Sequence, residues 1–73
     1  MFKVNDKVKF EVRKKRQGER FSLSWSGQVT MTDDMTRKEL SNALADEFLQ
    51  DVNKPRTDNP YTSNELVITL KVA

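Results

Sequence analysis

The stretch TRKELSNALADEFLQDVN, residues 36–53, decides the fold, because it has the features of one amphipathic helix with a specified beginning. Thr36, followed three residues later by Glu39, forms a capping box. In this motif each side chain accepts a hydrogen bond from the other residue's backbone N–H. Met35, just before the cap, can pack on Leu40 as a hydrophobic staple. These signals predict that the helix starts directly after Thr36.

One face of the predicted helix is apolar. Its apolar residues recur at spacings of three and four, the period of an α-helix, so they can lie together against a sheet. Asn53 stands before a Lys-Pro pair that cannot continue a helix, and it is a suitable end. We therefore predict a helix over about residues 37–52. The apolar stripe consists of Leu40, Ala43, Leu44 and Phe48, with Val52 at its end.

Three runs around this helix alternate apolar and polar residues with period two, which is typical of strands that bury one face. Two runs precede the helix and one follows it. Their apolar sets are Phe2, Val4, Val8, Phe10 and Val12; Phe21, Leu23, Trp25, Val29 and Met31; and Leu66, Ile68, Leu70 and Val72. The polar stretch 13–20 contains Gly18, which adopts a positive φ easily, and predicts a hairpin between the first two strands.

The segment 53–64 indicates where the third strand lies. It is twelve residues long, contains Pro55 and Pro60, and at ~3.3 Å per residue can travel back along the helix. This length favours a third strand beside the first and parallel to it, giving a sheet of order two-one-three with the helix across one face. In element order the arrangement resembles the β-grasp (ubiquitin-like) architecture.

We therefore predict an α+β fold, ββαβ, in a single small domain of residues 1–73. The expected sheet is small and β-grasp-like, with one helix packed across one face. The alternative is a ββαβ unit that completes its sheet by pairing with a second copy of the chain.

Composition excludes several classes of function. The chain of 73 residues has no Cys and no His, so we expect no disulfide, no metal and no cofactor. No apolar run is longer than that of 66–68, which is far short of the ~20 residues that cross a bilayer, and the N-terminus lacks the apolar stretch of a signal peptide. We expect a cytoplasmic (intracellular) protein that is not an enzyme, since so short a chain hardly encloses a pocket for a catalytic base.

The predicted hairpin tip is the most basic part of the chain. Residues 1–20 hold eight Lys or Arg and three Asp or Glu, whereas residues 21–73 hold five and eight. A cationic tip can bind phosphates with salt-sensitive, sequence-independent affinity, or it can bind an acidic protein surface. A solvated turn that keeps a strand edge from aggregating is the simpler interpretation. The candidate contacts are Arg13, Lys14, Lys15, Arg16 and Arg20.

The outward face of the second strand is almost without charge. Ser22, Ser24 and Ser26, followed by Gln28 and Thr30, are small or neutral residues that guard an exposed edge poorly. One interpretation is that this edge pairs with another chain. The other is ordinary solvation of a strand with good propensity.

These features predict a small non-enzymatic binding protein, an adaptor or inhibitor that occupies the surface of a partner protein. An acidic partner surface is favoured, because the excess of acidic residues in 21–73 opposes a polyanion that extends past the tip. This binding protein can also self-associate as a homodimer through the edge strand. The alternative function is a nucleic-acid-binding module that uses the basic hairpin 13–20. The aromatic residues of the first two strands lie on the apolar face of each strand, which argues against an exposed platform for stacking bases. We expect no membrane association.

Overall fold

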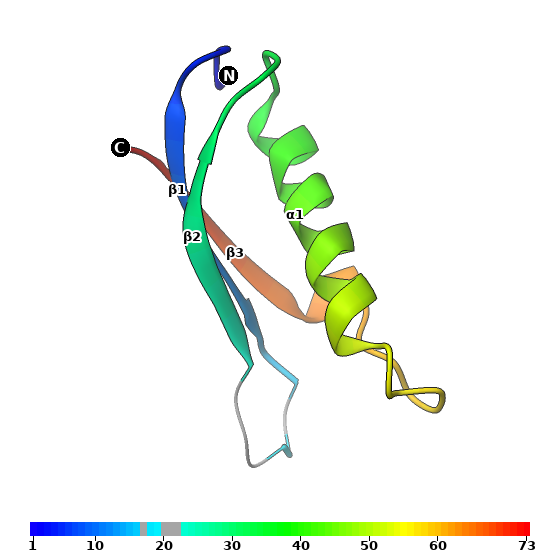
Figure 1. Cartoon of the computed structure of the whole chain (residues 1–73). Helices are drawn as coiled ribbons and strands as arrows, with labels where there is room; N and C mark the ends of the chain where they lie inside the picture. Colours follow the sequence, from blue (N-terminus) through cyan, green and yellow to red (C-terminus); the bar gives the residue numbers. More distant parts are fainter. Residues whose placement is uncertain (17, 20–22) are drawn as a thin grey trace.

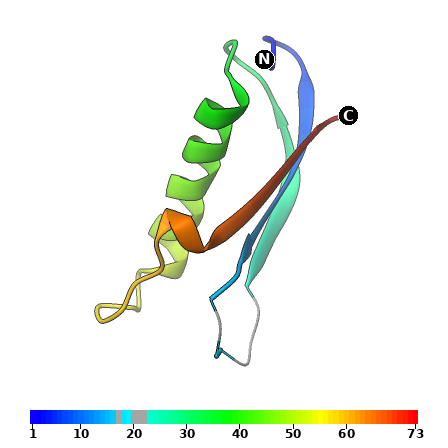
Figure 2. The ribbon, with the colours of Figure 1, turned by 180° about the vertical axis from the view of Figure 1, so that it is seen from behind.

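A computed structural model of the chain describes residues 1–16, 18–19 and 23–73. Helix α1 lies along one face of a three-stranded sheet, and both termini lie at the same end of the molecule (Figures 1 and 2). The predicted α+β class and ββαβ element order are confirmed. The elements are β1 (Lys7–Lys14), β2 (Ser24–Thr30), α1 (Arg37–Val52), the short 3-10 helix η1 (Ser63–Glu65) and β3 (Leu66–Val72).

The sheet has the predicted order β2-β1-β3, but β3 runs antiparallel to β1, so the predicted parallel pair is wrong. The length of α1 explains the difference. Its 16 residues span ~24 Å at ~1.5 Å per residue, about the length of a seven-residue strand, so the helix alone carries the chain back along the sheet. β3 therefore starts beside the end of β1 (Figure 1). The resemblance to the β-grasp architecture covers the order of the elements, not the direction of this pair.

The connection after α1 forms a closed loop and does not travel back along the helix. The Asn53 side chain donates a hydrogen bond to the Tyr61 carbonyl and accepts one from the Tyr61 backbone N–H, both at 2.9 Å. Asn53 is also the C-cap of α1, so Tyr61 is held at the C-terminal end of the helix. Asn59, with φ 55°, turns the chain within the loop. The length of this segment therefore does not predict its path.

The boundaries of α1 match the prediction, and Thr36 is its N-cap. The Glu39 backbone N–H donates to Thr36 Oγ1 at 3.1 Å, and the Thr36 backbone N–H donates to Glu39 Oε1 at 3.0 Å. One member of the predicted stripe is wrong, because Ala43 is exposed and Ala45 is buried in its place. The two alanines flank the same apolar row, and the helix is rolled so that the Ala45 flank meets the core.

The core lies between α1 and the inner face of the sheet. The Phe10 ring packs edge-to-face on Trp25, with the ring centroids 4.6 Å apart. It also lies over Gly27, the residue opposite on β2, which has no side chain to compete for this space. Trp25 and Ile68 are half-buried and pack against the core, and Phe21 lies outside the described residues. The buried cluster is Phe2, Val8, Phe10, Val12, Met31, Leu40, Leu44, Ala45, Phe48, Leu66 and Leu70.

The first strand is shorter than its alternating sequence predicts. A turn precedes it, in which the Asp6 backbone N–H donates to the Lys3 carbonyl at 3.0 Å and Asn5 has φ 74°. The turn interrupts the two-residue period, so Val4 is exposed although its parity predicts burial. Phe2 is buried, and it pairs through an isolated bridge with the residue before the cap of α1.

Candidate binding surfaces

The basic stretch 13–16 is divided between the two faces of the sheet. Successive residues of a strand point to opposite faces, so Lys14 and Arg16 share the inner side with the apolar residues of β1. The side chain of Lys14 is 3% exposed and that of Arg16 is 15% exposed, whereas that of Arg13 is 58% exposed. Lys15 is exposed as well. Two of the predicted tip contacts thus lie mostly inside the protein.

Lys14 and Glu19 form an ion pair that Tyr61 joins. Lys14 Nζ donates to Glu19 Oε2 at 2.6 Å and to Tyr61 Oη at 3.3 Å, and the Tyr61 hydroxyl donates to the same Glu19 oxygen. Desolvation lowers the pKa of Lys14, but the hydrogen bonds to Glu19 and Tyr61 outweigh it and leave this pKa raised. Hydrogen bonds from Lys14 and Tyr61 lower the pKa of Glu19. Both groups are charged at neutral pH.

Arg16 binds the connection that precedes β3. Its guanidinium donates to both carboxylate oxygens of Glu65, from Nε and from Nη2, the second at 2.7 Å. It also donates to the carbonyls of Asn59 and Pro60 at 3.1 and 3.0 Å. The hydrogen bonds from Arg16, followed by one from the Thr62 backbone, lower the pKa of Glu65 to about 2.

These side chains tie the hairpin to the connection after α1. Arg16 and Arg56 place their guanidinium carbons 4.4 and 4.3 Å from the centre of the Tyr61 ring, which adds cation–π attraction. The basic stretch alone does not reveal the partners of Lys14 and Arg16, although the parity that these two residues share with Val12 places them on the inner side. We call this set the tip network; its members are Lys14, Arg16, Glu19, Tyr61 and Glu65.

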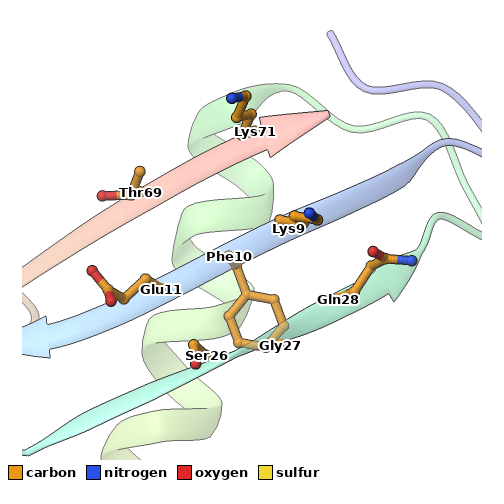
Figure 3. Close-up of a pocket in the computed structure, with 8 residues that line it drawn as sticks. All are labelled: Lys9, Phe10, Glu11, Ser26, Gly27, Gln28, Thr69 and Lys71. Atoms are coloured by element: carbon orange, nitrogen blue, oxygen red, sulfur yellow. The ribbon is translucent and has the colours of Figure 1, made fainter. Parts of the chain in front are cut away.

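The face of the sheet opposite α1, here called the outer face, is exposed and cationic (Figure 3). Lys9 and Lys71 lie directly opposite each other on β1 and β3, where like charges destabilise the pair. Among the residues that the structure describes, Lys7, Lys9, Lys15 and Lys71 form no ion pair, and Arg13 pairs with Glu11 at 3.2 Å. The outer face consists of Lys7, Lys9, Glu11, Arg13, Lys15, Ser24, Ser26, Gln28, Thr30, Val67, Thr69 and Lys71.

The outer face is nearly flat. A shallow depression of about 600 Å³ lies in its middle, between the side chains of Lys9, Glu11 and Lys71 and the β2 residues Ser26 and Gln28 (Figure 3). Of the serines predicted as contacts, Ser24 and Ser26 are exposed on this face. Ser22 and the predicted tip residue Arg20 lie outside the described residues.

On the other side of the sheet, a groove of about 610 Å³ separates β2 from the C-terminal half of α1. Trp25, Phe48 and Val52 give it an apolar floor, and Glu47 and Asp51 stand on its helix side. Among the described strands β2 pairs with β1 alone, so the groove runs beside backbone that is unpaired within that part of the chain.

In the described ranges, no group of three or more His, Cys, Asp and Glu side chains is placed to hold a metal ion. The helices of that part of the chain include none with the length and apolar character needed to cross a membrane. No family model, no curated protein and no solved structure matches the chain. The outer face and the groove are therefore the features from which a function can be inferred.

Proposed function

We propose that this chain is a non-enzymatic binding protein, an adaptor or inhibitor that covers an acidic surface of a partner protein with its outer face. The observation that carries the proposal is the set of lysines on that face without a carboxylate partner in the described chain, Lys7, Lys9 and Lys71. An acidic partner relieves the repulsion between Lys9 and Lys71 and gains attraction from several cations at once. We place this activity in the cytoplasm, as the sequence predicts.

The contact residues differ from those that the basic stretch alone suggests. Lys14 and Arg16 are engaged in the tip network, so the contact moves from the hairpin tip to the row on β1. Arg13 and Lys15 stay in this row because their parity is that of Lys9.

Glu11 favours a protein over a polyphosphate as the partner. Its carboxylate lies within the cationic row, 3.2 Å from Arg13 (Figure 3 shows Glu11 beside Lys9). A continuous row of phosphates is repelled by this carboxylate, whereas a protein surface of mixed charge can place a cation opposite it. Ser24 and Ser26 on the neighbouring strand add neutral hydrogen-bonding groups, which suit the polar rim of a protein interface.

Affinity capture from the source cells, with and without nuclease, tests the class of partner. The proposal predicts that the tagged chain retains the same proteins after nuclease treatment, because the contact is made to protein. Loss of all retained proteins after nuclease would show that nucleic acid had bridged them and would contradict the proposal.

Nucleic acid is the second candidate, because the outer face combines Lys and Arg with Ser, Thr and Gln, the side chains that contact phosphate and sugar. This candidate predicts that a random-sequence DNA duplex binds with an affinity that falls steeply with salt, with a log–log slope near −0.9 per phosphate contacted. The protein-binding proposal predicts negligible binding to this duplex at ~150 mM salt. Submicromolar binding there would decide for nucleic acid.

A further inference from the structure

We propose that the groove between β2 and α1 binds an extended, basic segment of a partner chain, which adds to the free edge of β2 as a further strand. This inference goes beyond the proposed function, because the groove lies on the helix side of the sheet and the acidic partner is assigned to the outer face. The observations that carry it are the unpaired backbone of β2, the apolar floor beside it and the carboxylates on its rim.

The backbone of β2 is arranged to accept another strand. Two backbone hydrogen bonds bracket its ladder with β1, from Lys14 N–H to the Leu23 carbonyl at 3.3 Å and from Met31 N–H to the Asp6 carbonyl at 2.8 Å. In an antiparallel pair, every second residue directs its N–H and C=O toward the neighbouring strand and the others direct theirs away. Leu23 and Met31 direct these groups toward β1. The residues of the other parity, Ser24, Ser26 and Gln28, therefore direct their N–H and C=O groups to the free edge.

The side chains of β2 do not protect this edge. Natural edge strands commonly carry Lys, Pro or a bulge that prevents pairing with another chain. The strand Ser24–Thr30 carries no charged residue and no Pro. An extended peptide can therefore pair with it through main-chain hydrogen bonds, as in other complexes formed by strand addition.

The floor of the groove is apolar because α1 packs mainly over β3 and β1 and leaves the inner side of β2 partly uncovered. Trp25 is consequently half-buried, and Phe48 and Val52 line the groove with it. Alternate side chains of an added strand point into this space. Apolar side chains and the aliphatic stems of Lys or Arg fit such a floor.

The rim of the groove selects basic side chains. Glu47 and Asp51 are four residues apart on α1, so they are neighbours on one helix face, and both line the groove. Lys54 pairs with Asp51 at 3.8 Å, but the two side chains are 78% and 83% exposed, so this pair exchanges easily for a ligand cation.

A second copy of the chain is a poor occupant of the groove. If two β2 edges pair antiparallel about a twofold axis, both α1 helices lie on the same side of the joined sheet and flank the seam. The Glu47 and Asp51 carboxylates of one copy then face the same carboxylates of the other copy across the seam. The neutral β2 of the second copy supplies no cation to compensate them. A basic segment of another protein supplies both a strand that pairs with the β2 edge and cations that face Glu47 and Asp51.

A synthetic peptide of sequence KTVTKT, acetylated and amidated, is the probe. One face of this peptide as a strand carries lysine, valine and lysine for the groove, and the other carries threonine to match the neutral outward residues of β2. Trp25 is the only Trp of the chain, so its fluorescence reports on the groove directly. We expect titration of the full chain to shift Trp25 emission to shorter wavelength, and the acidic peptide ETVTET to cause no shift.

Four variants, two of them controls, test where and how the peptide binds. Asp51→Lys reverses a charge on the rim and should weaken binding about tenfold, whereas Asp46→Lys, the same change on α1 away from the groove, should leave it within about twofold. Ser26→Pro removes one N–H at the free edge without removing a hydrogen bond to β1, and it should abolish binding. Circular dichroism shows whether each variant is folded, and Ser26→Ala controls for loss of the side chain.

Several results would overturn the inference. These are no Trp25 response to millimolar KTVTKT, an equal response to ETVTET, or equal losses in Asp51→Lys and Asp46→Lys. Sedimentation at increasing concentration tests whether a second copy of the chain occupies the groove. A dimer that hides Trp25 and excludes the peptide would show that it does. None of these results bears on partner capture through the outer face, so the two proposals fail independently.

Discussion

At the scale of single residues, Tyr61 connects parts of the chain that are distant in sequence. Its hydroxyl contacts Lys14 and Glu19 of the hairpin, and its backbone is bound by Asn53 at the end of α1. Tyr61 is 2% exposed, so these polar contacts are shielded from water. Shielded hydrogen bonds fix the hairpin to the connection and hold the Lys14 ammonium group inside the protein.

Removal of this hydroxyl should destabilise the protein. We expect Tyr61→Phe to lower the free energy of unfolding by about 1 to 2 kcal/mol, because the ring stays and the buried hydrogen bonds are lost. Urea unfolding measures the change. Thr57→Val, which removes an exposed hydroxyl in the same connection, should change stability by less than about 0.5 kcal/mol. Equal effects of the two variants would show that the tip network is not stabilising.

The lowered pKa of Glu65 predicts how the stability of the fold responds to acid. Its pKa is lowered to about 2 in the folded protein, first by the hydrogen bonds from Arg16, and an unfolded glutamate has a pKa of about 4.3. A group with a depressed folded pKa stabilises the fold above the unfolded value, and this contribution is lost as pH falls toward the folded value. Stability should therefore decline between about pH 4.5 and pH 2.

The variant Glu65→Gln should flatten part of this decline, because it removes one of the carboxylates with a lowered pKa. Urea unfolding at a series of pH values between those limits provides the measurement. Glu47→Gln, at an exposed site on α1, is the matched control and should leave the slope as in the wild type. A wild-type slope in Glu65→Gln would contradict the assigned role of the Arg16–Glu65 pair.

At the scale of elements, α1 is specified most completely by the sequence. Its cap, its start and its end all follow from local signals, since Thr36, Glu39 and Asn53 act within a few residues of the helix ends. The roll of the helix does not follow, because the two flanks of an apolar stripe are equivalent until the sheet is in place. For this reason the sequence pattern predicts Ala43 in the core, whereas the structure buries Ala45.

The N-cap can be tested directly. Thr36→Ala removes the oxygen that accepts from the Glu39 backbone N–H, and we expect a loss of about 1 kcal/mol in the free energy of unfolding. Thr32→Ala removes an exposed hydroxyl before the helix and should cost less. Chemical denaturation of both variants provides the comparison, and equal small effects would mean that the helix starts elsewhere.

The roll of α1 gives a second comparison of matched variants. Ala45→Leu adds bulk to a buried position and should cost about 1 to 3 kcal/mol, whereas Ala43→Leu adds it to an exposed position and should cost less than about 0.5 kcal/mol. Thermal or urea unfolding distinguishes them. The reverse order would mean that the predicted stripe, with Ala43 inside, is the correct one.

At the scale of the whole molecule, the protein carries opposite charge on its two layers. Lysines of the outer face cover one side, and Asp46, Glu47 and Asp51 lie on the exposed part of α1. The molecule measures 38 × 19 × 16 Å, so most of its mass lies near a surface. The two binding surfaces proposed above would therefore carry opposite charge, which is consistent with the proposal that the chain is an adaptor.

The sequence predicted this arrangement only in part. The alternation of apolar and polar residues, together with the capped helix, was sufficient to predict the class of fold and the order of the strands, because these depend on local pattern. The parallel direction predicted for β3 is wrong, because α1 alone carries the chain back along the sheet and Asn53 and Tyr61 close the connection after it into a loop. The division of the basic stretch could have been predicted, since the parity that places Val12 inside also places Lys14 inside. The groove depends on the position of α1 over the sheet and has no local signal.

The central claim is that the outer face is the surface that binds an acidic partner protein. The most direct test is the association rate of the captured partner with Lys9→Glu and with Lys38→Glu, the same reversal on α1, both at exposed sites. The fold should tolerate Lys9→Glu, because the new carboxylate lies opposite Lys71. We predict association about tenfold slower for Lys9→Glu and nearly unchanged for Lys38→Glu, with the difference shrinking as salt rises. A wild-type rate for Lys9→Glu, or an equal loss in both variants, would contradict the claim.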